Sequence, residues 1–99
     1  MNTEVSSASR KLVISSEHGR TQELERFLTT LPHRGLVLVA FHGPDCELLE
    51  GLLDDLCVGD GSHPDLSLTT SSHPNETLDD VLAFADAWLP SGDVQLVRT

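Results

Sequence analysis

The chain has 99 residues, of which 38% are hydrophobic and 22% are charged, and its formal net charge is −10. A chain of this length forms one small domain, and this composition is typical of a globular protein rather than a disordered one. The longest apolar run, residues 35–41, is far shorter than the roughly 18 residues of a membrane span, so the sequence predicts no membrane protein.

The charge is unevenly distributed along the chain. Residues 1–34 contain four acidic and five basic residues, whereas residues 35–97 contain twelve acidic residues and neither lysine nor arginine. Because phosphate binding requires Lys and Arg, we expect no nucleic-acid partner and no membrane partner. Such a surface would attract a basic protein. The acidity could equally be a habit of the whole proteome, as in salt-loving organisms, and this alternative stays open.

The N-terminal segment MNTEVSSASR is polar and lacks the apolar core of a secretory signal. We expect residues 1–9 to form a disordered tail and residues 10–99 to form a single α/β domain. The absence of a signal, together with only two cysteines, predicts a cytoplasmic protein with reduced thiols.

Hydrophobic periodicity predicts alternating strands and helices. In chain order these are a strand at 11–15, a helix at 21–31, a strand at 35–41, a helix at 44–56, a strand at 66–70, a helix at 77–89 and a strand at 94–97. This alternation predicts an α/β sandwich with a four-stranded, mainly parallel sheet. The order of the strands stays open, although the apolar segment GLVLVAF at 35–41 favours the middle of the sheet.

Ligands of open α/β sheets bind beyond the carboxyl ends of the strands. In this chain His18 follows the first strand, His42 and Cys46 follow the second, and His73 follows the third. These side chains could bind Zn²⁺ or a similar ion. No dense spacing motif supports a metal site, and loops after strands are commonly rich in residues that cap helices. We therefore expect no cofactor and keep the four residues as a possible ligand rim.

A nucleophile and base could be formed by Ser71 or Ser72 with His73. Adjacent residues at a strand end point apart, however, and no third member is evident, so the sequence predicts no catalytic triad. The segment LVLVAFHGPDCELLEGLL superficially resembles the strand, WCxxC motif and helix of thioredoxin. Its second cysteine, its Trp and the cis-proline loop are absent. Cys57 lies eleven residues after Cys46, about 16 Å along a helix, which excludes dithiol redox chemistry.

The segment TTSSHPNETLDDVLAFADAW resembles the C-terminal half of a group of short bacterial α/β proteins of unknown function. In that group a strand runs into a histidine-bearing loop, then the helical pattern E-[TS]-L-x-x-[VA]-L-x-F-A, then a last short strand. The resemblance is confined to the C-terminal third of this chain. It implies an α/β fold and no particular activity.

Two functions from different classes fit these observations. The first is a small acidic, non-enzymatic interaction module of the antitoxin, immunity or regulatory type, which binds a basic protein through acidic helix faces. These faces comprise Glu47, Glu50, Asp54, Asp79, Asp80 and Asp86. The alternative is a small metal-binding or hydrolytic domain that uses the histidines at the strand ends. A homodimer formed through Phe84 and Trp88 is also possible, unless both rings belong to the core.

Overall fold

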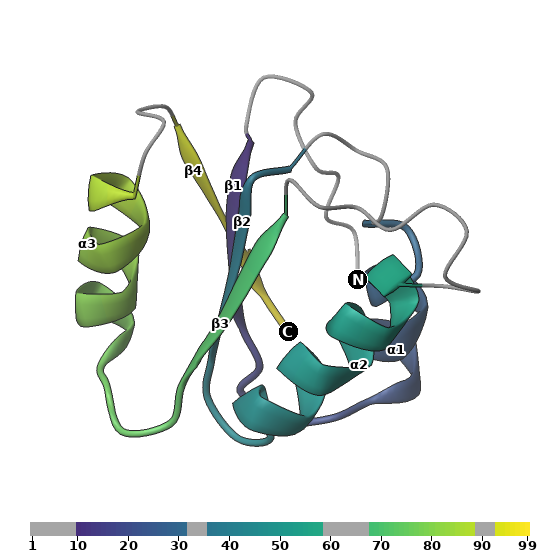
Figure 1. Cartoon of the computed structure of the whole chain (residues 1–99). Helices are drawn as coiled ribbons and strands as arrows, with labels where there is room; N and C mark the ends of the chain where they lie inside the picture. The colour runs from purple at the N-terminus through teal and green to yellow at the C-terminus, as the bar shows by residue number, and fades with distance from the viewer. Residues whose placement is uncertain (1–9, 32–35, 59–67, 89–92) are drawn as a thin grey trace.

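The protein is an α/β sandwich, and in the part of the chain that the structure describes three helices cover a four-stranded sheet (Figure 1). The computed structural model describes residues 10–31, 36–58, 68–88 and 93–99. In chain order the elements are β1 (Lys11–Ser15), α1 (Gln22–Leu28), β2 (Leu38–His42), α2 (Cys46–Val58), β3 (Thr69–His73), α3 (Leu78–Ala87) and β4 (Val94–Arg98). All strand pairs are parallel, and the order is β3-β2-β1-β4. The predicted fold class is therefore confirmed.

The sheet separates two apolar cores. Helices α1 and α2 cover one face and α3 covers the other (Figure 1). Because successive side chains of a strand point to opposite faces, Val39 and Phe41 of β2 enter the α1/α2 core while Leu38 and Ala40 enter the α3 core. The strand order thus places β2, apolar on both faces, in the interior of the sheet.

Most element boundaries differ from the predicted ones. α1 ends at Leu28 rather than at residue 31, β2 begins at Leu38 and β3 at Thr69, α2 extends to Val58, α3 spans Leu78–Ala87, and β4 extends to Arg98. β2 and β3 continue to His42 and His73, so both histidines are the last residues of strands and not loop residues. α2 begins at Cys46 rather than at Pro44, because Asp45 has a left-handed backbone with φ of 60°, which no α-helical residue adopts. The expected tail at 1–9, residues 35 and 66–67 of the predicted strands, and residue 89 of the last predicted helix lie outside the described residues.

The helices are short, and side chains cap the ends of α3. Its N-cap is Thr77, whose hydroxyl accepts a hydrogen bond from the backbone N–H of Asp80 at 3.1 Å. At its other end, the ammonium group of Lys11 donates to the carbonyls of Asp86 and Trp88. None of the described helices is long and apolar enough to cross a membrane.

Candidate functional site

A row of polar residues crosses the sheet at the carboxyl ends of the strands. In register, His73 of β3 lies beside His42 of β2, His42 beside Ser15 of β1, and Ser15 beside Arg98 of β4. The residues two positions earlier on β1 and β2 belong to the core beneath α3. Because alternate residues of a strand share a face, the row lies on the α3 side and closes that core with polar groups.

His73 is buried, and both of its ring nitrogens are hydrogen bonded. Its Nε2 lies 2.9 Å from the hydroxyl oxygen of Ser71, and its Nδ1 lies 2.5 Å from a carboxylate oxygen of Glu76. An ionised carboxylate can only accept, so the contact with Glu76 places a proton on Nδ1, and in the neutral ring Nε2 is then an acceptor for the Ser71 hydroxyl. Phe84 of α3 packs against the ring, with 4.7 Å between centroids, and fixes its position.

His42 is half-buried, and its Nδ1 lies 3.1 Å from the hydroxyl oxygen of Ser15. His18 lies away from the two strand histidines, in the loop between β1 and α1. It lines a hollow of about 560 Å³ together with Arg98 and Thr99. The structure therefore brings His42 and His73 together on neighbouring strands and leaves His18 in a separate place.

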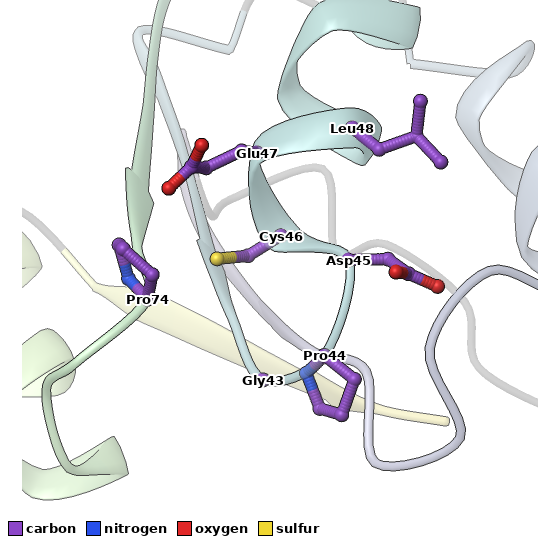
Figure 2. A pocket seen from close by; sticks show the side chains of 7 residues that line it. All are labelled: Gly43, Pro44, Asp45, Cys46, Glu47, Leu48 and Pro74. Atoms are coloured by element: carbon purple, nitrogen blue, oxygen red, sulfur yellow. The ribbon is translucent and has the colours of Figure 1, made fainter.

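Cys46 belongs to the core beneath α1 and α2, on the other side of the sheet from the histidine row. Its side chain is buried and points toward Pro74 beside a shallow pocket of about 690 Å³ (Figure 2). The walls of this pocket are Gly43, Pro44, Asp45, Cys46, Glu47, Leu48 and Pro74. Within the described ranges, no three residues of the His, Cys, Asp and Glu types are grouped to hold a metal ion.

The FHGPDC segment joins β2 to α2 and is hydrogen bonded to the loop that follows β1. The backbone N–H of Ser16 donates to the carbonyl of His42 at 2.9 Å, and its hydroxyl donates to the carbonyl of Pro44 at 2.8 Å. Gly43, with φ of 101°, has no room for a side chain, because a Cβ would lie 2.7 Å from the Ser16 carbonyl oxygen. Much of the polar character of this loop therefore supports its structure.

One further contact joins these two loops. The backbone N–H of Arg20 donates to Oδ2 of Asp45 at 2.9 Å. The exposed guanidinium of Arg20 pairs with Glu25 at 2.9 Å, and the hydrogen bond and charge of Glu25 raise the pKa of Arg20, with a smaller contribution from Asp45. These contacts orient the start of α1.

The outer face of α2 is both apolar and acidic. Leu48 and Leu56 are 45% and 37% exposed, although both are large hydrophobic residues. A groove of about 250 Å³ between α1 and α2 is lined by Glu25, Leu28, Thr29, Leu52, Asp55 and Leu56. α2 also carries the carboxylates Glu47, Glu50, Asp54 and Asp55, with no basic residue on the helix. We call this combination of groove, leucines and carboxylates the α2 surface.

The acidic residues predicted to bind a partner fall into two separate groups. Glu47, Glu50 and Asp54 belong to α2, where Asp54 also accepts a hydrogen bond of 2.6 Å from the hydroxyl of Thr70. The other three, Asp79, Asp80 and Asp86, are exposed on α3, which covers the opposite face of the sheet (Figure 1). One flat partner cannot contact both groups together.

The two aromatic residues considered for a homodimer pack against the core beneath α3. Phe84 and Trp88 are partly buried, and their ring centroids are 5.3 Å apart. Phe84 also contacts His73. These contacts give both rings a role within the monomer.

One residue of the His73 cluster, Glu76, was missed in the sequence. Ser71 was named with His73 and set aside because adjacent residues at a strand end point apart, whereas Ser71 and His73 lie at alternate positions of β3 and share a face. Extending the period-two pattern of β3 from Thr69 to His73 could have revealed this pair. Glu76 follows in the turn before α3, and no pattern in the sequence marks it as a partner of His73.

The comparisons with known proteins gave one match. The family model described as "Domain of unknown function (DUF7684)" matches residues 3–99. This match covers almost the whole chain, whereas the resemblance noted in the sequence covered only its C-terminal third. No match was found among curated proteins or among solved structures.

Proposed function

We propose that this chain, which belongs to the family of the domain of unknown function DUF7684, acts as a small acidic interaction module. In this proposal the protein is bacterial and cytoplasmic, and it binds a basic protein through the α2 surface in a non-enzymatic interaction. It would then regulate or neutralise that partner, as antitoxin and immunity proteins do.

The observation that carries this proposal is the exposure of Leu48 and Leu56 on a helix whose charged residues are all acidic. Protein interfaces combine an apolar centre with a polar rim. Here the groove beside Leu56 supplies an apolar centre, and the carboxylates of Glu25 and Asp55 line it with charge of one sign. An amphipathic helix with basic flanks is complementary to such a groove in both shape and charge.

The placement of the acids also argues that they serve binding rather than stability. Asp55 lies in the last turn of α2, where the partial negative charge of the helix end disfavours a carboxylate. A second copy of the chain would bring the same acidic rim and a further net charge of −10 against this surface. Repulsion between like charges therefore favours a basic partner over self-association through α2.

The test compares two variants with equal net charge. The first is Glu47→Gln, Glu50→Gln and Asp55→Asn on α2, which leaves the Asp54 bond to Thr70 intact. The second, the matched control, is Asp79→Asn, Asp80→Asn and Asp86→Asn on α3. Each variant and the unchanged protein are tagged, expressed in the native host and purified at low salt, and bound proteins are eluted with a salt gradient for mass spectrometry.

We expect a basic protein to be retained by the unchanged protein and by the α3 variant, and to elute from the α2 variant at clearly lower salt. Equal weakening by both variants would assign the effect to net charge alone and reject a defined surface. If no basic protein is retained by the unchanged protein, the acidity is a property of the proteome and the proposed function is wrong.

A further inference from the structure

We propose that Ser71, His73 and Glu76 form a catalytic centre for acyl transfer, with Ser71 as the nucleophile. Nε2 of His73 lies 2.9 Å from the hydroxyl oxygen of Ser71, and Nδ1 contacts the carboxylate of Glu76. In the neutral ring with its proton on Nδ1, the Ser71 hydroxyl donates to Nε2. This is the connectivity of the serine, histidine and carboxylate groups in serine hydrolases, a constellation recognised by geometry rather than by chain order. The centre lies on the α3 side of the sheet, opposite the α2 surface, so the proposal is independent of partner binding.

The position of β3 makes Ser71 accessible. β3 is an edge strand of the sheet, and no other strand of the described chain pairs with its outer side. Ser71 and Ser72 are both half-buried, whereas His73 is nearly covered. A substrate can therefore approach the hydroxyl of Ser71 from the edge of the sheet while the ring of His73 stays held by Phe84.

The same strand edge supplies a hydrogen-bond donor for a developing oxyanion. The backbone N–H of Thr69 donates to the carbonyl of Val37 at 3.0 Å, so Thr69 faces β2. Because backbone groups alternate in direction along a strand, Ser71 also faces β2 and the N–H of Ser72 points to the outer edge. A donor on the residue after the nucleophile is a recurrent part of oxyanion holes.

The proposed reaction is the hydrolysis of an ester in two steps. The Oγ of Ser71 bonds to the acyl carbon, its proton passes to Nε2 of His73, and the alcohol leaves with that proton as its bond to the acyl carbon breaks. Water then adds to the acyl carbon and gives a proton to Nε2. The bond between Oγ and the acyl carbon breaks, Oγ regains the proton, and a carboxylic acid is released. Glu76 positions the ring and stabilises its charge.

The charges around the centre restrict its substrates. Glu76 and the exposed Asp79 and Asp80 at the start of α3 are close to it in the chain, and residues 35–97 contain no lysine or arginine. A phosphate-bearing or carboxylate-bearing substrate would be repelled. Phe84 and Trp88 add apolar surface on the same side. The centre is therefore suited to neutral or cationic esters with a small apolar acyl group.

The test uses the full chain with a neutral alkyl fluorophosphonate and with p-nitrophenyl acetate. We expect one phosphonyl group per chain, located on Ser71 by peptide mass spectrometry, and slow release of p-nitrophenol that stops after this labelling. Ser71→Ala should abolish both. Thr70→Ala is the control, since Thr70 lies one position before Ser71 on β3, its hydroxyl bonds Asp54 of α2 and it takes no part in the proposed centre.

The positioning role of Glu76 has its own readout. Glu76→Gln should slow labelling about tenfold or more, and Glu76→Asp should restore part of the rate, while thermal unfolding shows whether stability has changed. Absence of labelling of the folded protein under conditions that label a known serine esterase would overturn the proposal. So would acetate hydrolysis that persists unchanged in Ser71→Ala.

Discussion

Lys11 and Trp88 are 77 residues apart in the chain, and the ammonium group of Lys11 donates a 3.0 Å hydrogen bond to the backbone carbonyl of Trp88. A second bond, of 3.2 Å, reaches the carbonyl of Asp86. Lys11 is the only lysine of the sequence and is almost completely buried. It satisfies carbonyl groups that the end of α3 cannot pair within the helix, and its positive charge is favoured at that end.

Replacing Lys11 with methionine should therefore destabilise the protein. Methionine keeps an unbranched apolar stem but leaves the carbonyls of Asp86 and Trp88 without their donor in a buried place. We expect a loss of about 1–3 kcal/mol in the free energy of unfolding, measured by urea titration. An unchanged or higher stability would mean that the cost of burying the ammonium group equals or exceeds the value of its hydrogen bonds.

The tight contact between Gly43 and Ser16 predicts opposite effects at two glycines. Gly43→Ala places a Cβ 2.7 Å from the Ser16 carbonyl oxygen at a backbone φ of 101°, so it should destabilise the fold. Gly51→Ala is the matched control, because its Cβ would meet nothing within 4 Å. In the middle of α2 it should stabilise by about 0.5–1 kcal/mol. Thermal unfolding of the two variants distinguishes them, and a shift in the same direction would contradict the loop geometry.

Asp45 has a strained backbone and a side chain that accepts a hydrogen bond from the neighbouring loop. Its φ is 60°, and Oδ2 accepts the backbone N–H of Arg20. Asp45→Ala loses the hydrogen bond and keeps the strain, whereas Asp45→Gly loses the bond and relieves the strain. We expect the glycine variant to be more stable than the alanine variant by about 1 kcal/mol in urea unfolding. Equal stabilities would show that the loop has moved to another conformation.

The fold was largely predictable because each element has a clear local pattern. The alternating helical and extended periods predicted all seven elements, and β1 at Lys11–Ser15 has its predicted bounds. The predicted start of α3 at residue 77 lies within one residue of the observed start, because Thr77 is the N-cap and this cap acts within one helical turn. The apolar composition of β2 favoured its interior position, since only a strand covered on both faces is apolar throughout.

The site was less predictable because its contacts depend on register and on distant chain segments. The pairing of His42 with His73 follows from the register of two strands. The capping of α3 by Lys11 joins segments that are 75 residues apart in the chain. Neither contact has a local signal. The left-handed conformation of Asp45 delayed the start of α2, although Pro44 is an ordinary first residue of a helix.

A last prediction separates what the acidic residues contribute to stability from what they contribute to binding. Asp55 lies in the last turn of α2, where a carboxylate opposes the helix dipole, and Asp79 lies in the first turn of α3, where a carboxylate is favoured. Asp55→Asn should therefore stabilise the protein by about 0.3–1 kcal/mol relative to Asp79→Asn.

Removing any acid also reduces the self-repulsion of a chain with net charge −10, but this effect is common to both variants. The difference between their urea midpoints at low salt therefore reports the helix dipole, and it should shrink as salt is added. If Asp55→Asn is the less stable of the two, Asp55 has a stabilising role in the fold, and its retention would no longer argue for a binding surface.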